Sequence, residues 1–125
     1  MEFINAEIQA YAQEFTSNED PLLQAVSEYT YANHSHPHML SGHLQGVFLE
    51  LISKMIRPSA ILEIGSFMGY STIALAKGLT SEGVLHTIDI NLTDIEKAKK
   101  HVAEAGFSNK VIFHSKNALE VIPEL

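Results

Sequence analysis

Hydrophobic residues recur at helical spacing in the first third of the chain. Between residues 4 and 15, apolar side chains lie three or four positions apart and predict a helix: Ile4, Ile8, Tyr11 and Phe15. A second helix is predicted from Pro21 to Ala32, because Asp20 can cap it and proline suits its first position. Its apolar positions available for burial are Leu22, Leu23, Val26 and Tyr29. A polar break over residues 33–38 follows.

A third, strongly amphipathic helix is predicted to start near Ser41. Its apolar positions follow the helical period: Leu44, Val47, Phe48, Leu51, Ile52 and Met55. Arg57 precedes Pro58, and the residue before a proline disfavours the helical conformation, so the helix should end there. The first part of the chain is therefore expected to be entirely helical.

After Pro58 the pattern changes to short apolar runs that alternate with helical segments. Strands are predicted at residues 60–64, 84–88 and 111–114, with helices at 70–79 and 93–105. Strands that alternate with helices of this length are typical of right-handed crossovers and a parallel sheet. The sequence thus predicts an α/β fold of about three strands, preceded by a helical arm.

Several residues are predicted to fix the ends of the later helices. Thr93 and Glu96 have the spacing of a capping box at the start of the helix that runs to residue 105. Gly106 suits the left-handed position after that helix. Asn117 is expected to cap a short last helix, which Pro123 limits.

Composition limits the classes of function. The chain has 125 residues, 46% of them hydrophobic, which fits one compact domain. Eight Lys and Arg against fifteen Asp and Glu give a net charge of −7, so we expect no nucleic-acid partner. The absence of cysteine excludes disulfides and thiolate metal sites. With neither a leader-like N-terminus nor a membrane-length apolar run, we expect a cytoplasmic protein without membrane association.

The segment with the clearest chemical meaning is the turn after the first predicted strand, where Gly65 and Gly69 have the spacing G-x-x-x-G. Glycines there let a ligand approach the backbone closely, at the end of a parallel sheet where ligands bind. Asp89 follows Gly65 by 24 residues, at the end of the second predicted strand, where a carboxylate can accept hydrogen bonds from ribose hydroxyls. The pair predicts a nucleoside-containing ligand.

The residues of this turn disfavour two other kinds of site. A nicotinamide site requires G-x-G-x-x-G, and here the bulky Phe67 stands at the middle glycine and obstructs a pyrophosphate. S-adenosylmethionine carries no phosphate and does not need that approach. A nucleophile elbow requires serine at the same position, so Ser66 and Ser71 do not form one.

Four histidines crowd the region before the third helix: His34, His36, His38 and His43. Imidazole is a common metal ligand, but these side chains lack the helical spacing and the glutamate of a zinc protease motif. We favour a loop around the mouth of the site over a metal site.

Four segments together resemble class I S-adenosylmethionine-dependent O-methyltransferases similar to catechol and caffeoyl-CoA O-methyltransferases, including their bacterial relatives. They are residues 38–46, 62–71, 87–91 and 117–125. The resemblance implies a Rossmann-like fold with an incomplete sheet at residues 58–125 and a helical arm and cap at 1–57.

The resemblance also implies roles for eight residues. Ser41 lies over the methionine part of the cofactor, and the amino-acid end is lined by Glu63, Gly65, Phe67 and Ser71. Asp89 holds the ribose. Asn117 and Ala118 border the adenine, although Lys116 stands where the family usually has glycine.

The family's chemistry, as the resemblance implies, uses a divalent metal that orients a hydroxyl of a small catechol-like or phenolic acceptor. Its ligands belong to segments beyond the fourth strand, which this chain does not contain. We therefore expect the N-terminal, cofactor-binding part of a longer enzyme, inactive alone. A naturally short, non-catalytic binding or interaction module is the alternative.

Without a fourth strand, residues 61–64 are expected to form an unpaired sheet edge. An apolar edge is a template for pairing with another chain. We expect self-association, by pairing across this edge or by packing of the helical arm on a neighbour.

Overall fold

The computed structural model describes residues 4–125, so residues 1–3 of the predicted arm lie outside the described part. The helical arm contains α1 (Ala6–Glu14), α2 (Pro21–Asn33), the short 3-10 helix η1 (Pro37–Met39) and α3 (Gly42–Ile56). The alternating part contains β1 (Ala60–Ile64), α4 (Tyr70–Ala76), β2 (Val84–Ile88), α5 (Leu92–Glu104), β3 (Val111–His114), α6 (Ala118–Val121) and η2 (Ile122–Glu124).

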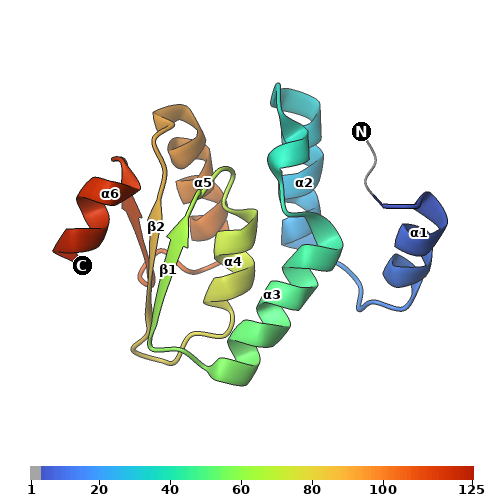
Figure 1. Cartoon of the computed structure of the whole chain (residues 1–125), viewed down its shortest axis with the longest axis horizontal. Coiled ribbons are helices and arrows are strands. Elements are labelled where there is room, and N and C mark those ends of the chain that lie inside the picture. Colours follow the sequence, from blue (N-terminus) through green and yellow to red (C-terminus); the bar gives the residue numbers. More distant parts are fainter. Residues whose placement is uncertain (1–3) are drawn as a thin grey trace.

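The three strands form one parallel sheet in the order β1-β2-β3. Ala60 pairs with Val84 and Leu85 pairs with Val111. Helices α4 and α5 lie on one side of the sheet and α6 on the other, while α1 stands apart beyond α2 and α3 (Figure 1). The predicted α/β fold with about three parallel strands and a preceding helical arm is confirmed.

Two predicted helix caps are confirmed, and one is wrong. Asp20 caps α2 by accepting the Leu22 N–H, and Asn117 caps α6 by accepting the Leu119 N–H. The capping box at Thr93 is wrong, because Asn91 caps α5 and accepts the N–H groups of Thr93 and Asp94. An N-cap side chain accepts the free N–H groups two and three positions after it, and here the cap lies two residues before Thr93.

Helix α4 is shorter than predicted and ends at Ala76, three residues before Leu79. Gly78 lies just after this end and packs closely against α3. A Cβ at this position would lie 2.2 Å from the Ser53 carbonyl carbon, so only glycine lets the chain turn this close to α3.

The two faces of the sheet differ in burial. On the face covered by α4 and α5, Glu63, Leu85 and Thr87 are buried. On the opposite face, Leu62 is 47% exposed and Ile64 is 64% exposed. The main hydrophobic core therefore lies between the covered face and the helices, and it includes Leu23, Val26, Met68, Tyr70, Ile73, Ala76, Leu85, Val102 and Val111.

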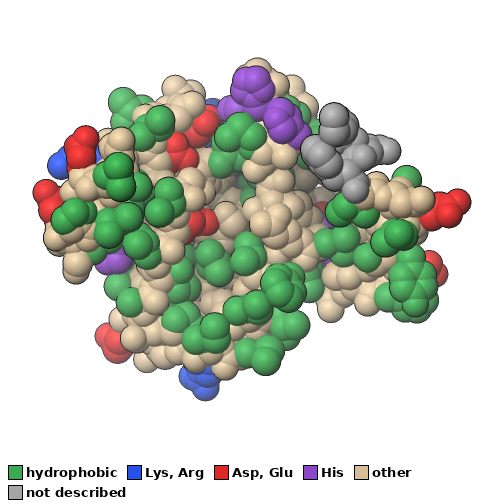
Figure 2. Space-filling model, in the orientation of Figure 1, with side chains coloured by type: hydrophobic (Ala, Val, Ile, Leu, Met, Phe, Trp, Pro, Cys, Tyr) green, Lys and Arg blue, Asp and Glu red, His purple; other side chains and the backbone are tan. Residues whose placement is uncertain are grey.

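Helix α3 packs against α4 through its small residues. Gly46 approaches the Tyr70 ring and Ser53 approaches Gly78, whereas much of the predicted apolar stripe is exposed, including Phe48, Leu51 and Met55. Figure 2 shows hydrophobic side chains gathered on the visible face over α3 and over α1. Helix α1 buries no residue. None of the helices within residues 4–125 is long and apolar enough to cross a membrane.

Candidate functional site

The turn between β1 and α4 has an unusual backbone conformation. Three of its residues have positive φ angles: Gly65 at 95°, Phe67 at 44° and Gly69 at 84°. A Cβ on Gly65 would meet no atom within 4 Å, so the turn faces open space there. At Gly69 a Cβ would come within 3.3 Å of the backbone of Ala98, so glycine is required there for packing as well as for conformation.

Glu63 lies beneath this turn rather than at its surface. Its carboxylate accepts hydrogen bonds from the hydroxyls of Ser71 (2.6 Å), Thr72 (2.5 Å) and Thr87 (2.6 Å). The residue is 8% exposed, and burial raises the pKa of its carboxyl although the three hydroxyls oppose the shift. Glu63 therefore joins the ends of β1 and β2 to the start of α4, and Ser71 links it to the surface of the small hollow.

Asp89 follows β2 and is held by backbone amides. Its Oδ2 accepts the Phe67 N–H at 2.9 Å, and its Oδ1 accepts the N–H groups of Ile90 (2.7 Å) and Asn91 (3.0 Å). An ionised carboxylate has about four acceptor positions, so roughly one stays available for a ligand. The carboxylate is thus oriented in advance and tied directly to the turn.

Two hollows meet at Gly65 and together contain seven of the eight predicted site residues. A small one of about 60 Å³ is lined by residues that include Ser41, Gly65, Phe67 and Ser71. A larger one of about 300 Å³ is lined by residues that include Gly65, Asp89, Asn117 and Ala118. Met39 and Leu40 of the arm also line the small hollow. The structure therefore brings together every predicted site residue except Glu63, which stays beneath the turn.

The end of the site at α6 is the more open one. Asn117 is exposed, and its side chain is engaged in capping α6 through the Leu119 N–H at 2.9 Å. Lys116 also lines the larger hollow, next to the backbone of Ile90 and Asn117. Its long side chain takes the place that the family resemblance assigns to glycine.

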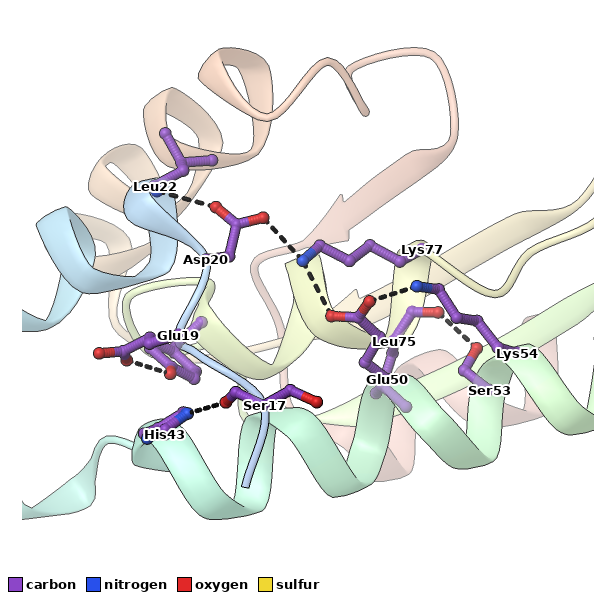
Figure 3. A network of polar contacts seen from close by, with 11 residues as sticks. Ser17, Glu19, Asp20, Leu22, His43, Glu50, Ser53, Lys54, Leu75 and Lys77 are labelled. Atoms are coloured by element: carbon purple, nitrogen blue, oxygen red, sulfur yellow. Dashed lines mark hydrogen bonds and ion pairs between the residues drawn. The ribbon is translucent and has the colours of Figure 1, made fainter. Parts of the chain in front are cut away.

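A cavity of about 410 Å³ lies elsewhere, between the α1–α2 connection and helices α3 and α4. None of the eight predicted site residues lines it. Figure 3 shows its polar network, in which Lys77 bonds Asp20 (2.8 Å) and Glu50 (2.9 Å), and Lys54 also bonds Glu50. The hydrogen bond from Lys77 lowers the pKa of the Asp20 carboxyl.

The same cavity contains a buried phenol. Tyr70 donates a hydrogen bond to Glu19, and burial together with this contact raises the pKa of its hydroxyl. Each charged group named here has a partner within the network, so the network joins the arm to α3 and α4. We assign no ligand to it.

One residue beside the site was not among the predicted site residues. His34, at the end of α2, packs its ring edge-to-face on Phe67 with centroids 4.7 Å apart. Its Nε2 lies 3.3 Å from Oδ1 of Asp94 in α5. His34 was predicted only to belong to a loop at the mouth of the site, because no spacing rule links it to Phe67, 33 residues later.

The metal alternative gains no support from the described residues. Within residues 4–125 no group of three or more His, Asp and Glu side chains could hold a metal ion. The rings of three of these histidines instead lie next to one another, tilted for His34 and His36 with centroids 6.1 Å apart and edge-to-face for His36 and His38 with centroids 5.8 Å apart.

Comparisons with known proteins give this geometry a context. The family model described as O-methyltransferase matches residues 13–125. A catechol O-methyltransferase from Niastella koreensis is 30% identical over 115 residues, which cover 92% of this chain and 52% of the relative. A caffeoyl-CoA O-methyltransferase from Petunia hybrida is 33% identical over 81 residues, 65% of this chain and 34% of the relative.

Solved structures similar to this chain are also O-methyltransferases. The O-methyltransferase TomG from Streptomyces achromogenes, determined in complex with SAM, is 32% identical with a TM-score of 0.85, over 95% of this chain and 53% of that one. An O-methyltransferase from Bacillus cereus in complex with SAH is 28% identical with a TM-score of 0.84, over 94% and 53%. The chain thus spans about half the length of these proteins. Because the family model covers most of its residues, the chain belongs to the O-methyltransferase family.

Proposed function

We propose that the two hollows around Gly65 bind S-adenosylmethionine, and that the chain supplies the cofactor-binding part of an O-methyltransferase. Asp89 carries this proposal, because a carboxylate preset by three backbone amides faces the larger hollow at the end of a parallel strand. The TomG structure is a complex with SAM and the Bacillus cereus structure a complex with SAH, which supports the same ligand class here.

The residues present fit such a ligand from end to end. The open space above Gly65 leaves room where the cofactor would cross from one hollow to the other. Asp89 would accept a hydrogen bond from a ribose hydroxyl, while Asn117 and Ala118 would border the adenine. The Ser71 hydroxyl donates to Glu63, so its oxygen is free to accept from the ammonium group of the amino-acid end.

We further propose that the acceptor is a hydroxyl of a small catechol-like or phenolic molecule. The support is the name of the Niastella koreensis relative, a catechol O-methyltransferase. When bound, the cofactor supplies an electrophilic methyl group on a sulfonium. The described residues hold and orient it, and no step is assigned to a divalent metal, because residues 4–125 offer no ligand group for one.

Self-association is part of the proposal. Strand β1 lies at an edge of the sheet, and Leu62 and Ile64 on it expose much of their side chains. An apolar edge strand offers unpaired N–H and C=O groups to a second copy. Light scattering at high concentration should detect a dimer or larger species, and a monodisperse monomer would overturn this part.

Calorimetric titration of the chain with S-adenosylhomocysteine tests the cofactor assignment, with NAD as the comparison ligand. We expect saturable binding of S-adenosylhomocysteine and none of NAD at the same concentration. A folded chain that binds NAD but not S-adenosylhomocysteine would overturn the cofactor assignment.

A further inference from the structure

His34 connects three parts of the molecule that lie far apart in the sequence. It follows the last residue of α2, its Nε2 lies 3.3 Å from Asp94 in α5, and its ring packs against Phe67 in the turn after β1. The backbone N–H of His36 donates to His34 Nδ1 at 2.9 Å, so in the neutral ring the hydrogen lies on Nε2 and faces Asp94. These contacts fix the position and the tautomer of the ring.

Phe67 needs such support because of its backbone conformation. Its φ of 44° lies in the left-handed region, which is unfavourable for a bulky side chain and persists only where surrounding contacts hold it. Two contacts do so: Asp89 accepts the Phe67 N–H at 2.9 Å, and His34 packs against the ring. Asp89 is the residue proposed to bind the ribose, and His34 belongs to the helical arm.

We infer that His34 is a positioning residue for the cofactor, which holds Phe67 in its left-handed conformation and so couples docking of the helical arm to cofactor affinity. The inference rests on the proposed function of the two hollows. His34 contacts neither hollow itself and acts through Phe67.

The layout of the small hollow explains why this coupling matters. One wall is formed by arm residues 39–41 and the other by turn residues 65–71. His34 lies five residues before the first wall and packs on the second, so its loss would let the two walls move relative to each other. Because coupling between sites is reciprocal, bound cofactor should also hold the arm more firmly on the turn.

A double-mutant cycle measures this coupling. The variants are His34→Ala, Phe67→Gly and the double substitution, each titrated with S-adenosylhomocysteine. Glycine adopts the left-handed conformation without help and has no ring for His34 to contact. We expect His34→Ala to weaken binding by about three- to tenfold in the original sequence and by less than about twofold when Phe67 is already glycine.

An equal loss in both backgrounds would show that His34 acts only through general stability, and no loss in either would show that it does nothing for binding. Both results would overturn the inference. His38→Ala is the matched control, because the His38 ring packs edge-to-face with His36, whereas the contacts with Phe67 and Asp94 are made by His34. It should leave affinity within about twofold.

Hydrogen exchange of the unliganded chain tests, without a cofactor, whether His34 positions Phe67. His34→Ala should accelerate exchange of the Phe67 amide about three- to tenfold, and leave the Leu85 amide, which bonds the Lys110 carbonyl, unchanged. Uniform acceleration of both amides, or of neither, would contradict the positioning role. Failure of the original chain to bind S-adenosylhomocysteine would count against the proposed function, and this measurement would still test His34.

Discussion

The two ends of the candidate site are built differently. At the end proposed for the amino acid and the ribose, the conformation is fixed by several contacts: the buried Glu63 with three hydroxyls, the three amides on Asp89, and the glycines of the turn. At the end proposed for the adenine, Asn117 is exposed and its side chain caps a four-residue helix, and the neighbouring Leu119 is 80% exposed. One end is preorganised, and the other is held by few contacts.

This difference indicates where binding energy should come from. Groups that are already fixed lose little entropy when a ligand binds, so the ribose and amino-acid contacts should dominate affinity. The adenine end should contribute mainly through the apolar surface of its hollow, which includes Ile64, Ile88 and Ile90. Substitutions at the two ends should therefore differ in size, for stability as well as for binding.

The largest expected effect is that of Glu63→Ala. The substitution leaves the hydroxyls of Ser71, Thr72 and Thr87 without their buried acceptor and opens a void beneath the turn. We expect the free energy of unfolding to fall by about 2–4 kcal/mol, measured by urea denaturation. A loss below about 0.5 kcal/mol would mean that this network does not hold the turn.

Gly69→Ala should reduce stability less than Glu63→Ala, because it strains the backbone of one residue and creates one close contact. Its φ of 84° disfavours any side chain, and the new Cβ would lie 3.3 Å from Ala98. We expect a loss of about 1–2 kcal/mol in the free energy of unfolding. Gly65→Ala is the matched comparison, since its φ of 95° is similar but its Cβ would meet open space. Equal stability losses in the two variants would remove the Ala98 contact as a cause.

A smaller effect concerns pH. Burial raises the Glu63 pKa above its ordinary value of 4.5, so its contribution to stability is fully present below that value and is lost as pH rises through the raised pKa. Glu63→Gln removes this titration. The unfolding free energy of the variant relative to the original should therefore increase with pH across that window, as measured by thermal or urea unfolding at several pH values. A relative decrease would show that the pKa is lowered.

The smallest effect is expected for Asn117→Ala at the adenine end. Its side chain caps only the short α6, so the unfolding free energy should fall by about 0.5 kcal/mol. Affinity for S-adenosylhomocysteine should change by less than about threefold. A loss as large as that of a substitution in the turn would reverse the ranking of the two ends.

Sequence periodicity was sufficient for the architecture, and seven of the eight residues predicted for the site line the two hollows. The strands, the two glycines and Asp89 are local signals, since each follows from the pattern of a short segment and the ends of parallel strands meet at one sheet edge. The predicted cap of α5 was wrong because asparagine and threonine are both favourable at an N-cap. Whether Asn91 or Thr93 takes that position depends on where the backbone becomes helical in the folded chain.

Contacts made between distant segments could not be predicted in this way. Nothing in the spacing of residues indicates that His34 contacts Phe67, or that the Glu63 carboxylate accepts hydrogen bonds from three buried or half-buried hydroxyls. The apolar side chains on one face of α3 likewise predict that this face is buried. In the structure the small residues Gly46 and Ser53 face α4 instead, so part of the apolar face is exposed to solvent. Tertiary packing decides each of these features.

The most direct test of the cofactor assignment is calorimetric titration with S-adenosylhomocysteine of the original chain and of Asp89→Ala. Glu96→Ala serves as a control that removes one exposed acid at the surface of α5. Loss of a charged hydrogen-bonding partner should cost about 1.5–3 kcal/mol, which is a roughly 10- to 150-fold weaker affinity. The account predicts this loss for Asp89→Ala and none for Glu96→Ala. Equal affinity of all three proteins, or a folded original chain that does not bind, would contradict it.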